Sequence, residues 1–114
     1  MSIHRIGSGP RMSQAVVHGD TAYLSGHVAE GATVTEQARR ILARIEAVLD
    51  QAGSDKSKLL SAQIWLADIA TFDEMNAVWE AWIVPGEPPA RATVESRLAD
   101  PKYLIEISVI AAIR

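Results

Sequence analysis

Apolar residues recur at helical spacing in two segments of the chain. The longer predicted helix runs from about Val34 to Ala52, and its other face is charged. Its apolar positions are Val34, Ala38, Ile41, Leu42, Ile45, Val48, Leu49 and Ala52. Thr33 and Glu36 have the spacing of a capping box, and Gly53 suits the left-handed residue that often ends a helix. We expect the charged face to be solvated and assign it no catalytic role.

The second predicted helix runs from about Phe72 to Ile83. Its apolar stripe consists of Phe72, Met75, Trp79 and Trp82. Thr71 and Glu74 have the spacing of another capping box, and Pro85-Gly86 closes the helix. We assign Trp79 and Trp82 to packing, because tryptophans in an amphipathic pattern are usually buried in a core or an interface.

Six further segments have the residue preferences of strands. They are Ile3 to Ile6, Gln14 to His18, Thr21 to Ser25, Leu60 to Leu66, Ala90 to Ser96 and Tyr103 to Ala112. Gly19-Asp20 suits a tight hairpin, and a turn is expected near Asp100-Pro101. Between the helices, Leu60, Ala62, Ile64 and Leu66 alternate with Ser61, Gln63, Trp65 and Ala67, which predicts a central strand covered differently on its two faces.

The resulting order, βββαβαββ, predicts an α+β fold with two helices on one face of a sheet. We find no internal repeat and no linker, so residues 1–114 are expected to form a single domain. No segment remains to cover the other face of the sheet, which carries mixed residues such as Trp65. We therefore expect that face to be buried against sister subunits.

Composition narrows the possible functions. Of the 114 residues 48% are hydrophobic, and the net charge of -3 does not favour nucleic acid as a partner. The absence of cysteine excludes disulfides, thiolate metal sites and thiol nucleophiles. The first residues lack the apolar core of a signal peptide, and no later run is long enough to span a membrane, so we expect a cytoplasmic protein with no membrane partner.

Metal and nucleotide sites are not expected. His4, His18 and His27 lack the spacing of a metal motif, and no cluster of carboxylates accompanies them. The segment Gly7-Ser8-Gly9-Pro10 precedes a strand pattern, not a helix whose amides could bind phosphate. The chemistry must therefore come from other side chains.

Arg91 and Glu106 are the two candidates, and each has two interpretations. Arg91 follows the stiff Pro88-Pro89 pair at the entry to a strand, so it could clamp a carboxylate or form a structural salt bridge. The spacing alone favours the salt bridge. Glu106 lies within an apolar strand, where it could exchange a proton near neutral pH or could be an edge charge that prevents aggregation.

The segment Pro89-Ala90-Arg91-Ala92-Thr93-Val94-Glu95, followed by Ile105-Glu106-Ile107, resembles the C-terminal signature of the Rid (reactive intermediate deaminase, or YjgF) family. Tyr23-Leu24-Ser25-Gly26-His27 and the run from Met75 to Trp82 also resemble this family. Arg11-x-Ser13 and Pro101-Lys102-Tyr103 are most similar to its short YoaB-like branch.

The resemblance implies a homotrimer of chorismate-mutase-like subunits, with clefts between them. It makes Arg91 the clamp for a substrate carboxylate and Glu106 the group that positions or protonates around the attacking water. It also implies that Ser25 lines the pocket, that Thr93 contributes mainly through its backbone, and that Asn76 lies near the cleft. Arg11 replaces a family aromatic residue, and could either bind a dicarboxylic substrate or pair with an acid across the interface, the interpretation we favour.

The implied reaction is the hydrolysis of 2-aminoacrylate and related enamine or imine acids to 2-keto acids and ammonia, without a cofactor or metal. A non-catalytic protein that binds or senses small carboxylates is the alternative. RNA cleavage ranks last, because the chain has no recognisable basic face.

Overall fold

A computed structural model describes residues 1–114 and has the predicted order of elements. The strands are β1 (Ile3–Ile6), β2 (Ala15–His18), β3 (Thr21–Leu24), β4 (Leu59–Leu66), β5 (Ala90–Glu95) and β6 (Ile105–Ala112). The helices are α1 (Val34–Gln51) and α2 (Phe72–Trp82), with short 3-10 turns η1 (Lys56–Lys58) and η2 (Ile69–Thr71). The predicted βββαβαββ order is confirmed.

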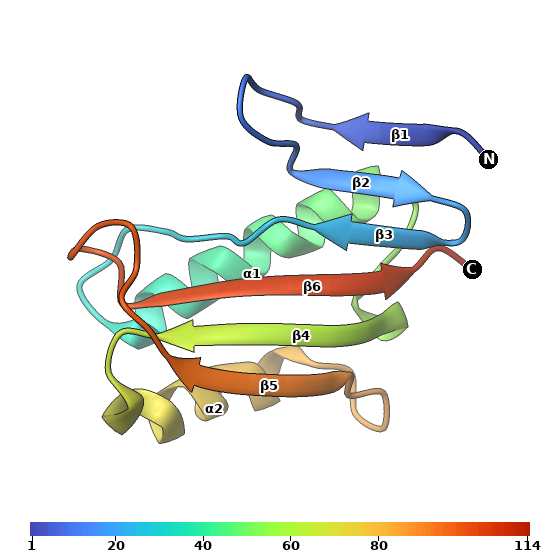
Figure 1. The fold of residues 1–114 in the computed structure, drawn as a ribbon. Coiled ribbons are helices and arrows are strands. Elements are labelled where there is room, and N and C mark those ends of the chain that lie inside the picture. The colour runs from blue at the N-terminus through green and yellow to red at the C-terminus, as the bar shows by residue number, and fades with distance from the viewer.

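The six strands form one mixed sheet in the order β1-β2-β3-β6-β4-β5 (Figure 1). Only β4 and β5 run parallel, as the crossover through α2 requires, and the other neighbours are antiparallel. The predicted hairpin lies between β2 and β3, where Gly19 has a φ of +62°. Strand β4 is an interior strand, as predicted, whereas β5 is an edge.

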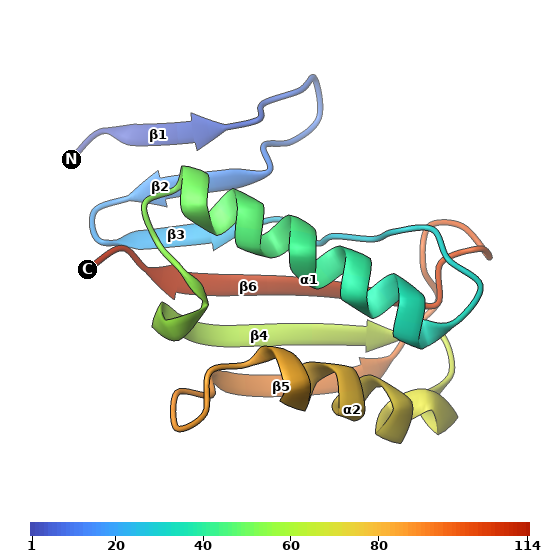
Figure 2. The same ribbon diagram turned by 180° about the vertical axis from the view of Figure 1, so that it is seen from behind.

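Both helices lie on the same face of the sheet (Figure 2). Along β4, Ala62, Ile64 and Leu66 point into the core that α1 and α2 cover. The opposite face has no covering layer, and it exposes Tyr23 and Val94 by 46% and 49%. Neither helix combines the length and the apolar character needed to cross a membrane.

The ends of α1 follow the predicted signals. Thr33 Oγ1 accepts a hydrogen bond from the Glu36 amide at 3.1 Å, and Gly53 follows the helix with a φ of +82°. The second capping box is wrong, because the Thr71 side chain makes no capping hydrogen bond. Glu74 instead accepts hydrogen bonds from the amide and hydroxyl of Thr35, so it joins the two helices.

Two residues of the apolar patterns are more exposed than the rest of their pattern. The pairing of β4 with β6 shifts register between Leu59 and Ser61, so Leu59 takes the buried position and Leu60 is 50% exposed. On α2, Met75 and Trp79 are buried as expected, but Phe72 is 38% exposed. Phe72 lies at the first turn of α2, where it contacts Arg91.

Candidate functional site

Glu106 lies on the interior strand β6, on the face of the sheet that no helix covers. It pairs with Trp65 of β4, whereas the flanking residues Ile105 and Ile107 point into the core. The interpretation of Glu106 as an edge-strand charge is therefore wrong. Its carboxylate lies against the backbone of Gly26.

The segment after β3 brings Ser25 and Gly26 beside Glu106. His27 exchanges two backbone hydrogen bonds with Ile107, at 2.8 and 3.1 Å, and this bridge fixes the segment next to β6. Ser25 donates from its amide and its hydroxyl to the Gln14 carbonyl, at 3.0 and 3.3 Å. The structure thus brings together Ser25, Gly26 and Glu106. Gly26 was not predicted to be a site residue, although it lies in the Ser25-Gly26-His27 motif.

Arg11 belongs to the loop between β1 and β2. A hydrogen bond of 2.8 Å from the Gly9 amide to the Met12 carbonyl closes a turn that contains Arg11. The same loop ends at Gln14, which holds Ser25. Arg11 is exposed and forms none of the four ion pairs of the subunit, so its guanidinium is free to meet a ligand or another chain.

Arg91 lies on the edge strand β5 and points toward α2. Its guanidinium carbon is 5.8 Å from the centre of the Phe72 ring and 5.6 Å from that of Trp79. Nη1 is 3.9 Å from the Met75 sulfur. No ion pair of the subunit includes Arg91, so the structural salt bridge that its sequence position favours does not form within the chain.

Thr93 and Asn76 belong to the neighbourhood of Arg91. Thr93 is two residues further along β5 and points to the same face, and its hydroxyl is buried without a hydrogen-bond partner. Asn76 is half-buried on α2, directly after Met75. The candidate residues therefore form two groups, one around Glu106 and one around Arg91.

Arg91 and Glu106 do not meet within one chain. Arg91 pairs with Ala62, which points into the core, whereas Glu106 pairs with Trp65, which points to the uncovered face. Successive residues of a strand point to opposite faces, so the two side chains lie on opposite sides of the sheet with β4 between their strands. The two groups can build a common site only where two chains meet.

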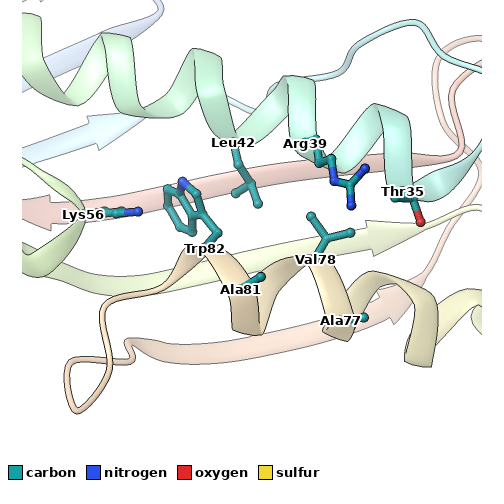
Figure 3. Close-up of a pocket in the computed structure, with 8 residues that line it drawn as sticks. All are labelled: Thr35, Arg39, Leu42, Lys56, Ala77, Val78, Ala81 and Trp82. Atoms are coloured by element: carbon teal, nitrogen blue, oxygen red, sulfur yellow. The ribbon is translucent and has the colours of Figure 1, made fainter.

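A separate groove lies between α1 and α2, with a volume of about 390 Å³ (Figure 3). It is lined by Thr35, Arg39, Leu42, Lys56, Ala77, Val78, Ala81 and Trp82. Ala77 and Ala81 leave it open because they are one turn apart and too small to reach α1. None of the candidate site residues lines this groove.

The sequence and the fold match known proteins over nearly the whole chain. The family model described as Endoribonuclease L-PSP matches residues 2–113. The RutC family protein YoaB from Escherichia coli K12 is 45% identical over 115 residues, covering 99% of this chain and 100% of the relative. The chain belongs to this family, which is also called Rid or YjgF.

Solved structures agree with this membership. A YjgF family protein from Neisseria meningitidis has a TM-score of 0.98 and 44% identity, covering 100% of this chain and 97% of that one. A protein of the YjgF/YER057c/UK114 family from Mycobacterium tuberculosis has a TM-score of 0.91 and 28% identity, covering 97% of this chain and 99% of that one. The predicted fold and the similarity to the YoaB-like branch are thus confirmed.

Proposed function

We propose that this protein is an enamine/imine deaminase of the Rid type, with its active site between the subunits of a homotrimer. The observation that carries the proposal is an arginine without an anionic partner on a sheet edge. Arg91 is half-buried, positively charged and held by aromatic rings, with no acid of its own chain to neutralise it. Such a cation suits the carboxylate of a small substrate.

Glu106 supplies the second half of the site. Its carboxylate lies against Gly26 on the uncovered face, and no ion pair of the subunit includes it. A carboxyl group there can take a proton from an attacking water and return it to the leaving nitrogen. In addition, the Ser25 hydroxyl, which donates to the Gln14 carbonyl, can accept a hydrogen bond at the same end of β3.

The reaction needs only proton transfers and water. The enamine 2-aminoacrylate gains a proton at its terminal carbon and loses one from nitrogen to become an imine. Water adds to the imine carbon while one of its protons passes to the nitrogen, which gives a carbinolamine. The remaining hydroxyl proton then passes to the nitrogen, and the C–N bond breaks with its electron pair leaving on ammonia as the C=O bond forms. Because such imines hydrolyse spontaneously, orientation and acid–base help of roughly a hundred- to ten-thousandfold would be sufficient.

A second subunit is required to unite the two halves. The edge strand β5 has free backbone groups on its outer side, and Ile69, Phe72 and Val94 around it are exposed by 46%, 38% and 49%. The Ile69 amide donates to the Glu95 carboxylate at 2.9 Å, which keeps η2 beside β5. This apolar edge suits burial against the Glu106 side of another chain.

Two other functions compete with deamination. Non-catalytic binding of a keto acid needs only the cation, and a nearby carboxylate would repel the ligand, so Glu106 favours chemistry. The family description names an endoribonuclease, but the net charge of -3 does not favour RNA as a substrate. Of the three functions, deamination is the one that uses both the Arg91 cation and the Glu106 carboxylate.

The test is to generate 2-aminoacrylate in situ with a dehydratase and to follow the release of keto acid and ammonia. Wild type should accelerate the release, and Arg91→Ala and Glu106→Gln should each lose most of the acceleration. Arg39→Ala and Glu80→Gln make the same changes at exposed helical positions and should act as wild type. Wild type without any acceleration would exclude the deaminase for this substrate.

A further inference from the structure

We infer that Phe72 and Trp79 are positioning residues for Arg91: their rings hold the guanidinium in place without neutralising its charge. The inference rests on the proposed function, because it concerns the same carboxylate clamp. It follows from the surroundings of Arg91, where the two ring centres lie 5.8 and 5.6 Å from the guanidinium carbon.

A carboxylate could also hold an arginine in place, but it would occupy the N–H groups that a substrate needs. A ring attracts a cation through the negative charge on its face and provides no oxygen to accept from the N–H groups. The Met75 sulfur, 3.9 Å from Nη1, is only a weak acceptor. The rings therefore orient the guanidinium and leave most of its donors for an incoming anion.

The two rings differ in how much they contribute to the hydrophobic core. Trp79 is 5% exposed and belongs to the hydrophobic core, so its replacement would disturb packing as well as Arg91. Phe72 is 38% exposed although the apolar stripe of α2 includes it. A partly exposed aromatic ring that contacts a cation is well placed to orient that cation. Phe72 is consequently the position where this role can be separated from folding.

The experiment compares wild type with Phe72→Leu, which keeps an apolar side chain but removes the ring. We expect Phe72→Leu to bind 2-oxobutanoate about fivefold more weakly in calorimetry, and to raise KM for the imine by a similar factor with a smaller change in kcat. Phe72→Tyr, which keeps a ring, should bind as wild type does. Leu60→Ala changes another exposed apolar side chain and is the control for surface effects.

Dependence on Arg91 is tested with a double variant. Adding Phe72→Leu to Arg91→Ala should not weaken binding beyond Arg91→Ala alone, because the ring then has no guanidinium to hold. Binding by Phe72→Leu equal to that of wild type, or an equal loss with and without Arg91, would overturn the inference. Wild type that binds no keto acid would overturn it too, whereas binding without hydrolysis would remove only the proposed deaminase reaction.

A spectroscopic measurement keeps the test valid if Phe72→Leu fails to assemble. In wild-type protein, the Nε–H signal of Arg91 can be assigned by its absence from the spectrum of Arg91→Lys. Two nearby rings should shift this signal away from the position typical of exposed arginines. A signal at that ordinary position would overturn the inference without any variant at Phe72.

Discussion

Glu106 can lie against Gly26 because position 26 has no side chain. A Cβ atom added to Gly26 would be 2.9 Å from the Glu106 carboxyl carbon and 3.3 Å from its Cγ, and would overlap Oε2. We expect Gly26→Ala to displace the carboxylate and to lower kcat about a hundredfold, the scale of acid–base help from one group. The steady-state rate of keto acid release measures this effect.

Gly9→Ala is the matched control for Gly26→Ala. The nearest atom to a Cβ on Gly9 is the Met12 carbonyl oxygen at 3.8 Å, an ordinary contact. Neither glycine has a positive φ, so backbone strain does not enter the comparison. Combining Gly26→Ala with Glu106→Gln should cost no more than Glu106→Gln alone, and a fully additive loss would contradict the displacement.

Gln37 fixes the loop that leads into β6. It is fully buried, and its amide nitrogen donates to the carbonyls of Gly31 and Lys102, both at 2.9 Å. Its side-chain oxygen accepts from the Leu104 amide at 2.8 Å, directly before β6 begins. Gln37→Leu would leave these groups unpaired, so we expect a loss of about 3 kcal/mol in the free energy of unfolding.

Urea unfolding measures this loss, and Gln51→Leu is its control because Gln51 is exposed near the end of α1. Glu106 is two residues beyond Leu104, so a folded Gln37 variant should also lose activity. A variant as stable as wild type would mean that water replaces the three hydrogen bonds.

The sequence was sufficient to predict the order of the elements because each element carries its own local signal. Thr33 and Gly53 mark the ends of α1, and Gly19-Asp20 marks the hairpin. Local signals do not set the register between strands that are far apart in sequence. The exposed position of Leu60 follows from a shift between β4 and β6 that no pattern within β4 reveals.

The same limit applies to the site. Arg91 and Glu106 were expected to act in a cleft between subunits, but that they lie on opposite faces within one chain depends on the pairing of β5 and β6 with β4, which the sequence does not reveal. The role of Phe72 was missed because its spacing with Met75 and Trp79 is that of a core stripe. The available signal was an aromatic pair two turns apart on the helix that precedes the strand of Arg91.

Glu30 and Lys102 form an exposed ion pair with a distance of 3.0 Å from Oε1 to Nζ. The hydrogen bond from Lys102, and next its charge, lower the pKa of Glu30, and the same contacts raise the pKa of Lys102. A carboxyl group whose pKa is lower in the folded chain than in the unfolded chain stabilises the fold at pH values above its unfolded pKa. This stabilisation is lost as the pH falls through its folded pKa. A lysine whose pKa is higher in the folded chain stabilises the fold at pH values below its unfolded pKa, and this stabilisation is lost as the pH rises through its folded pKa.

We therefore expect Lys102→Met to melt at a slightly lower temperature than wild type at neutral pH. The difference should fade as the pH falls through the lowered pKa of Glu30, which lies below its ordinary value of 4.5, and again as the pH rises through the raised pKa of Lys102, which lies above its ordinary value of 10.5. Thermal unfolding across the pH range measures it. Arg39→Met, which removes an exposed cation that forms no ion pair in the subunit, should show no such profile.

Mixing two inactive variants tests whether Arg91 and Glu106 of different chains share a site. The sheet separates the two residues within a chain, so a working site needs Arg91 from one subunit and Glu106 from its neighbour. We expect Arg91→Ala and Glu106→Gln each to be inactive alone. After the two variants are mixed in equal amounts, unfolded and refolded together, about a quarter of wild-type activity should return. In a ring of randomly mixed subunits, one site in four pairs an intact Arg91 with an intact Glu106. Mixing without unfolding is the control and should restore activity only as fast as subunits exchange. If the refolded mixture stays inactive while mixed oligomers are present by mass spectrometry, the two residues do not meet across the interface and the shared site is wrong.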